Sequence, residues 1–378
     1  MSSYRIAFFY DKITKFGGAE RILTSLSSIW PDAPIFTTVY NKKNTPWTST
    51  LKIIPSYVQT LPFASAHPSC YSFLSPLSSE SFSFDEYNIV ISITSSYGKR
   101  IVTKPGTLHI CYCLTPTRYL WSGFEIYVDK PGFSYVNPLA RTALRMVIPS
   151  QRRNDFIYAQ RPDSYIAISQ TVSQRIRKYY KRESSVVYPP VNTQQFSVAP
   201  KSGKEDYFLI VSRLVPYKRI DYAIDACNIL KKKLIIIGDG IDRRHLMLRA
   251  GPTIQFLTNR LTDEQLAWYY QNSLCLIFPG EEDFGITAVE AQSCGKPVLG
   301  LKKGGLEETV IPGVTGEMYE SAHVRDLAVQ LKRFNPAKYS SENCRGSAAR
   351  FAETIFKSRI RQTVELNYEN YRKDSKKN

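Results

Sequence analysis

Long apolar runs and paired cysteines are both missing from this chain. No stretch of its 378 residues approaches the roughly 18 consecutive apolar residues of a membrane-spanning helix. The apolar stretch at residues 6–10 is shorter than the apolar region of a secretory signal peptide. The 7 cysteines form neither a C-x-x-C pair nor a regular framework. We therefore expect a cytoplasmic protein of a reducing compartment that is at most peripheral on the inner face of a membrane.

Several nucleotide, metal and nucleic-acid motifs are missing as well. The loop containing Gly17 and Gly18 lacks the G-x-G-x-x-G pattern of dinucleotide sites and the lysine of phosphate-binding loops, so neither NAD binding nor ATP hydrolysis is indicated. No Asp-x-Asp pair lies near the motifs described below, and we expect no cofactor, no metal site and no need for a divalent metal. The absence of helix-turn-helix, zinc-finger and RNP-like patterns argues against a nucleic-acid partner.

Positive charge, in contrast, is abundant. The formal net charge is +17, and residues 1–200 carry 22 basic and 11 acidic side chains. Such a surface suits an anionic membrane or a phosphate-bearing ligand, although a solvated basic face explains the charge equally well. The basic residues of this half cluster at Arg141, Arg145, Arg152, Arg153 and Arg161, and again at Arg175, Arg177, Lys178, Lys181 and Arg182.

Apolar strands alternate with amphipathic helices along the chain, which is typical of α/β proteins with mainly parallel sheets. The length favours two domains, and residues 191–203, rich in proline and small polar residues, are predicted to link them. We predict two Rossmann-like, doubly wound domains over residues 1–190 and 204–356, with a C-terminal helix over 357–378 that packs back towards the first domain and ends in frayed basic residues. The strand candidates are residues 4–10, 88–93, 108–113, 165–168 and 185–188, then 207–211, 234–237, 254–257, 274–278 and 297–300.

Two carboxylates, Glu282 and Glu290, stand eight positions apart across a strand-to-helix boundary. With one acid on the loop and the other one turn inside the helix, their separation is roughly 8 to 12 Å. Retaining glycosidases hold their carboxylate pair at about 5 to 5.5 Å around one bond, so this spacing better suits the two ends of a long ligand such as a sugar nucleotide. The alternative is an acidic loop followed by an exposed helical glutamate.

Two cations follow the first strand of the second domain. Arg213 ends that strand and Lys218 begins the following helix, which directs both towards the carboxyl edge of the sheet, where doubly wound folds bind ligands. A diphosphate is their natural partner, because arginine engages it bidentately and lysine adds a point charge. In the first domain, Gly17 and Gly18 precede a helix whose N-terminus suits an anion, although a tight turn explains them equally well. If the two sheets face each other, one deep cleft lies between them.

These features occur with further segments in one fixed order, and each segment follows a strand or opens a helix. Here the chain resembles the retaining glycosyltransferases of family 4, which have a GT-B fold, from Arg5 to about Phe356. Within that family it looks most like bacterial mannosyltransferases of O-antigen and exopolysaccharide assembly. The segments that carry the resemblance are 17–20, 109–121, 161–169, 187–191, 213–219, 238–240, 256–261, 282–290, 293–298 and 304–316.

The resemblance implies a role for residues in both domains. Arg213 and Lys218 would hold the donor diphosphate, and Gly17 and Gly18 would approach its distal phosphate. The first domain would face the acceptor, with Thr115 and Arg118 on that side.

The remaining donor contacts implied by the resemblance lie in the second domain. Glu282 and the backbone of Phe284, Gly285 and Ile286 would bind the transferred sugar, and Glu290 would accept hydrogen bonds from the ribose. The base would meet Arg260 and Leu261.

One position departs from the family pattern. Many relatives have histidine where Leu114 stands, and a leucine side chain can neither hydrogen-bond nor accept a proton. His109 lies five residues earlier on the strand, and this odd spacing turns it to the opposite face, as expected for a core histidine. In a front-side retaining transfer the departing phosphate oxygen can take the proton of the acceptor, and the chemistry then tolerates Leu114. The alternative is a diverged or weakly active member of the family.

We therefore expect a retaining glycosyltransferase that transfers a hexose, in first place mannose from GDP-mannose, to a lipid-linked or polysaccharide acceptor. Arg213 and Lys218 would stabilise the leaving group while Glu282 orients the sugar. A transferase that uses a UDP-sugar and a GT-B epimerase remain alternatives. Outside enzymes, the alternative is a basic module that binds nucleic acid or a membrane surface and has an inactive cleft.

Overall fold

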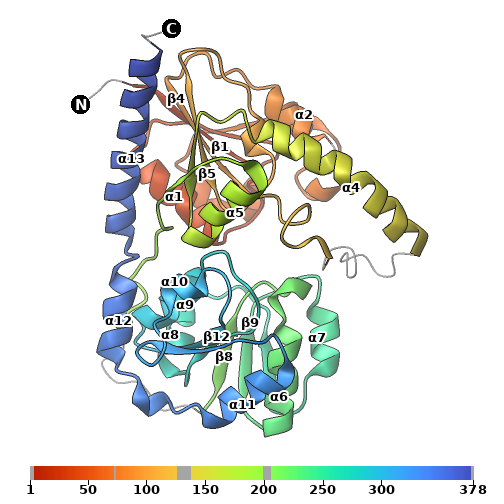
Figure 1. Cartoon of the computed structure of the whole chain (residues 1–378), viewed down its shortest axis with the longest axis vertical. Coiled ribbons are helices and arrows are strands. Elements are labelled where there is room, and N and C mark those ends of the chain that lie inside the picture. The colour runs from red at the N-terminus through yellow and green to blue at the C-terminus, as the bar shows by residue number, and fades with distance from the viewer. Residues whose placement is uncertain (1–3, 72–73, 126–137, 199–205, 376–378) are drawn as a thin grey trace. The chain divides into compact units, whose positions relative to one another are not determined.

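The computed structural model describes residues 4–71, 74–125, 138–198 and 206–375 (Figure 1). The chain divides into two compact α/β units. The first unit contains the residues up to Ser122, residues 145–190 and the C-terminal residues from Thr354. The second contains residues 191–353 together with those of 123–144 that are described.

The first unit is built on seven parallel strands in the order β3-β2-β1-β4-β5-β6-β7. Strands β1 and β4 pair from Ile6 with Ile89 to Tyr10 with Ile93, and the chain order reverses at this pair. The central strands are buried along their whole length, which explains their continuous apolar sequences. The strands are β1 (Ile6–Tyr10), β2 (Ile35–Thr37), β3 (Ile53–Pro55), β4 (Ile89–Thr94), β5 (Leu108–Cys113), β6 (Ser164–Ala167) and β7 (Ser185–Val186).

Helices accompany this sheet between the strands. Apolar residues at helical spacing, among them Ile22, Leu23 and Leu26, form the buried side of α1. The side chain of Ser169 caps α5 by accepting a hydrogen bond from the Val172 N–H. The described helices are α1 (Gly18–Ile29), α2 (Ser75–Glu80), α4 (Pro138–Tyr158), α5 (Gln170–Tyr180) and α13 (Glu353–Asp374), with 3₁₀ turns η1 (Lys42–Asn44), η2 (Pro46–Thr48), η3 (Tyr57–Thr60), η4 (Pro68–Tyr71) and η5 (Gly98–Arg100).

The C-terminal helix α13 belongs to the first unit. Its Phe356 ring lies 6.2 Å from the ring of Tyr112 on β5, and the hydroxyl of Tyr371 accepts a 3.1 Å hydrogen bond from the Gly106 N–H. Figure 1 shows α13 running beside this sheet to the C-terminus. Burial of the aromatic and aliphatic side chains at its start ties the helix to the first unit although the preceding chain belongs to the second.

The second unit contains six parallel strands in the order β10-β9-β8-β11-β12-β13. They are β8 (Phe208–Val211), β9 (Leu234–Ile237), β10 (Ile254–Leu257), β11 (Leu276–Phe278), β12 (Val298–Leu301) and β13 (Gly316–Tyr319). The helices are α6 (Ile220–Leu230), α7 (Arg243–Arg249), α8 (Asp263–Asn272), α9 (Ile286–Ser293), α10 (Leu306–Thr309), α11 (Val324–Arg333) and α12 (Ser341–Ala349), with 3₁₀ turns η6 (Pro216–Lys218) and η7 (Pro336–Lys338). The prediction of two doubly wound parallel sheets is confirmed, whereas β2, β3 and β13 are strands that the sequence did not predict.

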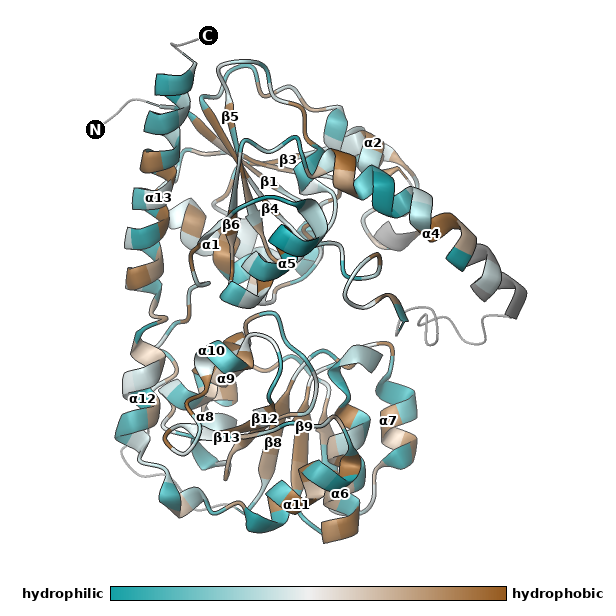
Figure 2. Cartoon of the chain, in the orientation of Figure 1, coloured by the Kyte–Doolittle hydropathy of each residue, from teal (hydrophilic) through white to brown (hydrophobic). Residues whose placement is uncertain are grey.

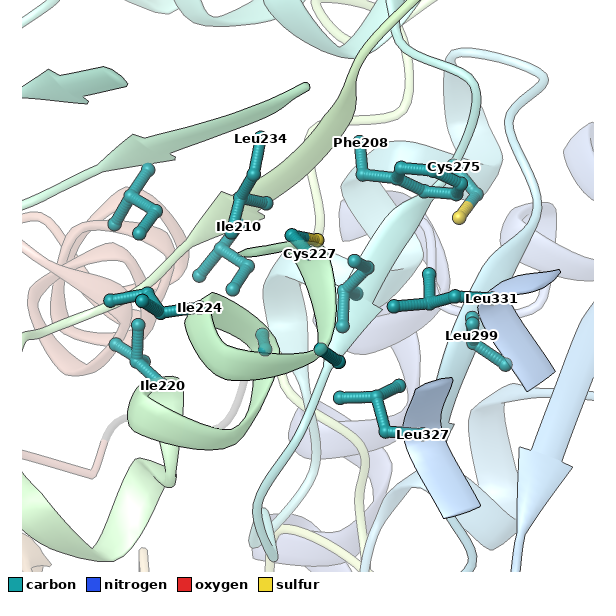
Figure 3. Close-up of a cluster of buried hydrophobic side chains, with 14 of the residues drawn as sticks. Phe208, Ile210, Ile220, Ile224, Cys227, Leu234, Cys275, Leu299, Leu327 and Leu331 are labelled. Atoms are coloured by element: carbon teal, nitrogen blue, oxygen red, sulfur yellow. The ribbon is translucent and has the colours of Figure 1, made fainter. Parts of the chain in front are cut away.

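Two apolar clusters cover the faces of the second sheet. One joins the strands to α6 and α11 and includes Ile210, Leu234 and Leu327 (Figure 3). The other packs α8 and α9 against the sheet through Tyr270 and Ala288. The strands of this unit are coloured as hydrophobic in Figure 2, as burial on both faces requires.

The segment predicted as a linker is in part a component of the second unit. Val191 donates a backbone hydrogen bond to the Phe351 carbonyl, and Phe196 is fully buried against the ring of Tyr270, 5.8 Å away. Apolar residues in a segment rich in proline and small polar residues thus find partners that are distant in sequence. Residues 199–203 of the predicted linker lie outside the described residues.

No helix in the described parts of the chain combines the length and the apolar character needed to cross a bilayer.

His109 is a core residue of β5. Its odd spacing from Leu114 predicts this, because that spacing turns the two side chains to opposite faces of the strand. His109 is fully buried, and its Nε2 lies 2.8 Å from the Ser92 hydroxyl on β4. Burial, assisted by the positive charges of Arg161 and Arg182, lowers the pKa of His109 to about 3. The imidazole therefore stays neutral in the folded protein while an unfolded histidine, with a pKa of about 6.5, takes up a proton on mild acidification.

This pKa difference predicts a pH dependence of stability. The contribution of His109 to the free energy of unfolding is complete above about pH 6.5. It is lost as the pH falls towards 3, because only the unfolded state binds the proton in this range. Between pH 7 and pH 5 the free energy of unfolding of the first unit should fall by about 2 kcal/mol through this residue, measured by denaturant titration. His109→Gln should remove this part of the pH dependence, whereas the control His67→Gln, at an exposed position, should keep it. Equal slopes for His109→Gln and the wild type would contradict this account.

Candidate functional site

The order of the second sheet reverses between β8 and β11, and ligands of doubly wound sheets bind beyond the carboxyl ends of the strands at such a point. The loop after β8 carries Arg213 and Lys218, and the loop after β11 carries Glu282 and Phe284. The structure thus brings together, at one sheet edge, the cations and the first carboxylate that the sequence predicts as donor-binding residues.

Lys218 is the most tightly held of these residues. It ends η6, its side chain is buried, and its ammonium group forms an ion pair with the Glu282 carboxylate. The Nζ atom also lies 5.3 Å from the centre of the Tyr217 ring and 5.9 Å from that of Phe278. A carboxylate and two aromatic faces therefore fix one positive charge at the reversal of the sheet.

Arg213 lies on the same loop but at the surface. Its guanidinium donates a 2.9 Å hydrogen bond to the hydroxyl of Tyr217, which orients the planar group. A guanidinium has five N–H donors in a fixed fork, the arrangement that matches a phosphate group. The exposed arginine and the buried lysine thus combine a planar donor with a point charge.

Glycines allow the loops at this edge to pack backbone against backbone. A Cβ atom on Gly238, after β9, would lie 1.9 Å from the Ser212 carbonyl oxygen, and one on Gly280, after β11, would lie 2.6 Å from that of Lys218. Both contacts are too short for any side chain. The loop that carries Arg213 and Lys218 is therefore held between two neighbouring loops, and its cations have little freedom to move.

The loop that carries Glu282 is held in the same way, by a pair of glycines. Gly304 and Gly305, after β12, pack on this loop: a Cβ on Gly304 would lie 2.2 Å from the Glu282 carbonyl oxygen, and the Gly305 N–H donates to that oxygen at 2.8 Å. Gly285 then begins α9 with a φ of 91°, a conformation that favours glycine. These glycines together fix the backbone of the loop that carries Glu282.

Phe284 anchors this loop and is not itself a surface group. Its ring is buried and meets the Phe351 ring edge to face at 5.2 Å. The ring is thus a structural anchor, whereas the neighbouring backbone at Gly285 and Ile286 forms the start of α9. A helix N-terminus presents backbone N–H donors, which suits oxygen-bearing ligands.

Glu290 lies in the interior of α9 and is only 3% exposed, so the alternative of an exposed helical glutamate is wrong. The Tyr270 hydroxyl on α8 donates a 2.8 Å hydrogen bond to its Oε2 atom. A buried carboxylate requires such partners, because an uncompensated one is strongly disfavoured. Tyr270 therefore sets the position of Glu290, and no sequence pattern indicates this pairing between two helices.

Arg260 and Leu261 lie on another loop, between β10 and α8. Two strands of the sheet separate β10 from β11. Arg260 is exposed, whereas Leu261 packs partly on the apolar cluster of α8 and α9. A capping box of Thr262 and Gln265 fixes the start of α8 directly behind them.

In the first unit, Gly17 and Gly18 form the start of α1, with Gly17 as its N-cap. The Tyr10 hydroxyl donates a 2.7 Å hydrogen bond to the buried Glu20 carboxylate in the first turn of this helix. Asp11, at the carboxyl end of β1, accepts hydrogen bonds from Thr94 and from backbone N–H groups after β4. Asp11 therefore joins the two loops at the reversal of the first sheet, a role that the sequence did not reveal.

The segment after β5 is organised around a buried carboxylate of α4, Asp155. It accepts hydrogen bonds from the Thr117 hydroxyl at 2.9 Å, the Trp121 indole at 2.8 Å and the Tyr180 hydroxyl at 2.9 Å, and it forms a 2.8 Å ion pair with Lys99. Burial opposes the charge, but Lys99 and these donors outweigh it and lower the pKa of Asp155. Thr117 and Trp121 thus have a structural role.

The residues of this segment that the sequence predicts on the acceptor side are Thr115 and Arg118. Thr115 is buried and accepts a 3.3 Å hydrogen bond from the buried Arg175, and Arg118 is half-buried. Leu114 is also half-buried, and its N–H donates to the Thr94 carbonyl at 2.9 Å. The backbone of Leu114 therefore continues the hydrogen-bond ladder of β4 and β5. A histidine at this position would differ from leucine in the chemistry of its side chain.

Within the described ranges, no three His, Cys, Asp or Glu side chains lie close enough together to hold a metal ion.

Comparison with known proteins agrees with the arrangement of the second unit. Residues 191–350 match the family model of glycosyl transferases group 1. An uncharacterized glycosyltransferase of Methanocaldococcus jannaschii is 28% identical over 45% of this chain and 48% of its own length. The alpha-1,3/1,6-mannosyltransferase ALG2 of Dictyostelium discoideum is 28% identical over 40% of this chain and 46% of its own length. The matches thus span about half the length of these relatives.

Solved structures match over almost the entire chain. HepE of Anabaena, in complex with UDP and glucose, is 18% identical with a TM-score of 0.69 and covers 96% of this chain and 99% of its own. Sucrose-phosphate synthase of Thermosynechococcus elongatus is 16% identical with a TM-score of 0.71 and covers 97% of this chain and 100% of its own. The chain therefore has the GT-B fold of these structures, and its residues 191–350 match the model of the glycosyl transferases group 1 family.

Proposed function

We propose that this protein is a retaining glycosyltransferase that moves a hexose from a nucleoside diphosphate sugar to a glycan or lipid-linked glycan. The observation that carries the proposal is the grouping of Arg213, Lys218 and Glu282 at the reversal of the second sheet, within the group 1 domain. Two cations there suit a diphosphate, and the adjacent carboxylate suits the hydroxyls of its sugar.

The donor that we propose is GDP-mannose. The likeness to a mannosyltransferase supports mannose, and Glu290, held by Tyr270, supplies an acceptor oxygen for the ribose. A UDP-sugar is the second candidate, since HepE, with which the chain shares its fold, was solved with UDP-glucose. Guanine and uracil present different hydrogen-bonding edges, so nucleotide binding distinguishes the two candidates.

In the proposed reaction the bond between the anomeric carbon and the phosphate oxygen breaks, and a bond to the acceptor oxygen forms on the same face. The departing diphosphate oxygen takes the proton of the acceptor, so no base is needed at Leu114. Arg213 and Lys218 stabilise the negative charge that develops on the diphosphate. Glu282 orients the sugar through its hydroxyl groups.

The ion pair of Lys218 with Glu282 has a consequence for donor binding. A diphosphate beside Lys218 competes with the carboxylate for the ammonium group, because both are anionic partners of one buried cation. In our proposal the donor replaces Glu282 as the partner of Lys218, and the released carboxylate accepts hydrogen bonds from the sugar. Binding of the diphosphate and placement of the sugar are thereby coupled.

Titration calorimetry with free nucleotides tests the choice of donor. We expect GDP to bind more tightly than UDP, with retention of the anomeric configuration in the mannosylated product read by NMR. Tighter binding of UDP would reject GDP-mannose and favour the second candidate. An inverted anomer would refute the front-side mechanism, and a chain that binds none of the nucleotides would favour the non-enzymatic alternative.

Glu282→Gln tests the coupling. Transfer from GDP-mannose should fall by about 10²–10³-fold, as for the loss of other groups that stabilise a transition state. Binding of GDP alone should be retained or strengthened, because Lys218 no longer has to break an ion pair with a carboxylate before it contacts the diphosphate. The control is Glu281→Gln, the adjacent glutamate, which pairs with Lys303 at 3.1 Å. Equal loss of transfer in both variants, with circular dichroism showing intact folds, would contradict the role of Glu282.

Tyr270→Phe tests the position of Glu290. Loss of one hydrogen bond to a buried carboxylate should weaken GDP binding by about tenfold, since such bonds contribute about 1.5–3 kcal/mol. We expect the KM for the donor to rise with little change in kcat. The control is the neighbouring Tyr269→Phe, which leaves the hydrogen bond to Glu290 in place. Unchanged affinity of Tyr270→Phe for GDP would show that Glu290 does not contact the nucleotide.

A further inference from the structure

Helix α4, whose residues from Arg145 on belong to the first unit, has one face that is tied to this unit. Ile148 and Asp155 are buried, and the Arg152 guanidinium donates a 2.6 Å hydrogen bond to the Leu120 carbonyl. These residues follow one another at intervals of four and three, so they share a side of the helix. Through Arg152 and Asp155 this face holds the segment that ends at Trp121.

The opposite face of α4 is exposed and combines apolar with basic side chains. Met146 is 71% exposed, and Val147 and Ile157 are each 51% exposed. Arg153 is exposed on the same side, whereas Arg145 lies three residues before Ile148 and seven before Arg152 and so belongs to the tied side. Figure 2 shows hydrophobic and hydrophilic residues alternating along α4. We call Met146, Val147, Arg153 and Ile157 the outer face of α4.

Some of the arginines in the two basic clusters of the sequence are not on the outer face of α4. Of the first basic cluster, Arg152 bonds to Leu120, and Arg161 pairs with Glu80 at 2.8 Å. In the second cluster, Arg175 is buried. Part of the sequence cluster thus serves the fold, whereas Arg153 is exposed beside the large apolar groups of the outer face.

Single exposed apolar side chains are common, but this grouping is not explained by solvation alone. Exposure of three large apolar residues within about three turns of one helix costs free energy in water, and Arg153 beside them is exposed and does not cover them. The boundary of an anionic bilayer suits both kinds of side chain, since apolar groups enter the acyl region and cations meet the headgroups. The net charge of +17 favours the same partner at longer range.

We propose that the outer face of α4 docks on an anionic lipid bilayer. The purpose of this docking rests on the proposed function, because it presumes an acceptor that is carried by a lipid. The opposite face of the same helix positions Thr117 and Trp121, so docking connects the bilayer to the predicted acceptor side through one rigid element. A lipid-linked acceptor in that bilayer reaches the enzyme without first leaving the membrane.

Flotation with vesicles tests the docking surface on the full chain. The wild type should bind vesicles of phosphatidylcholine with phosphatidylglycerol, and bind pure phosphatidylcholine vesicles far less. Met146→Glu/Ile157→Glu should weaken binding to the anionic vesicles by at least about tenfold. The control is Ile355→Glu/Leu366→Glu, an exposed apolar pair of α13 with the same spacing and the same change in charge, which should bind as the wild type does.

A second variant tests the cation separately. Arg153→Gln keeps the apolar groups and should reduce the preference for phosphatidylglycerol, as added salt should in the wild type. Failure of the wild type to bind vesicles, or equal losses in both glutamate pairs, would overturn the proposal. The proposal would also be overturned if the wild type sediments as a dimer and changes to this face abolish the dimer. The face would then be a contact between two copies of the chain. GDP binding in solution should be unchanged in every variant, and this separates failure of docking from failure of the proposed function.

Discussion

Close packing of backbone against backbone at the carboxyl edge of the second sheet is the constraint on which the candidate site depends. Gly238 and Gly280 enclose the loop that ends in Lys218, and Gly304 lies against the carbonyl of Glu282. Because these contacts exclude side chains, the loops approach closely enough for a lysine from one strand end and a glutamate from another to form an ion pair. The chemistry that we propose is thus a consequence of where glycine stands in the sequence.

The first unit is organised by a different device. Its buried Asp155 binds Lys99, Thr117, Trp121 and Tyr180, so a single carboxylate fixes the segment after β5, the start of η5 and the last turn of α5. A charge-assisted cluster of this kind is costly unless every member is paired, which makes its geometry specific. Glycine contacts thus place the groups proposed to meet the donor, whereas a polar cluster anchors the segment on the predicted acceptor side.

The regular features of the fold follow from local patterns, and the sequence predicts them well. Apolar strands such as Ile6–Tyr10 and the apolar period of α1 need only neighbouring residues, and the grouping of Arg213, Lys218 and Glu282 follows from their places at strand ends. The pairs that could not be predicted join residues far apart in the chain: Asp155 with Lys99, Glu290 with Tyr270, and Phe196 with the core of the second unit. Which polar groups become buried together is decided by tertiary packing, and no single-sequence pattern reports it.

The central claim is that the reversal of the second sheet binds the donor diphosphate. A crystal structure of the protein with GDP-mannose tests it most directly. The account predicts the diphosphate within hydrogen-bonding distance of Arg213 and Lys218, with the Glu282 carboxylate moved from Lys218 to the sugar hydroxyls. A nucleotide sugar bound elsewhere, with the Lys218 to Glu282 ion pair intact, would contradict the account.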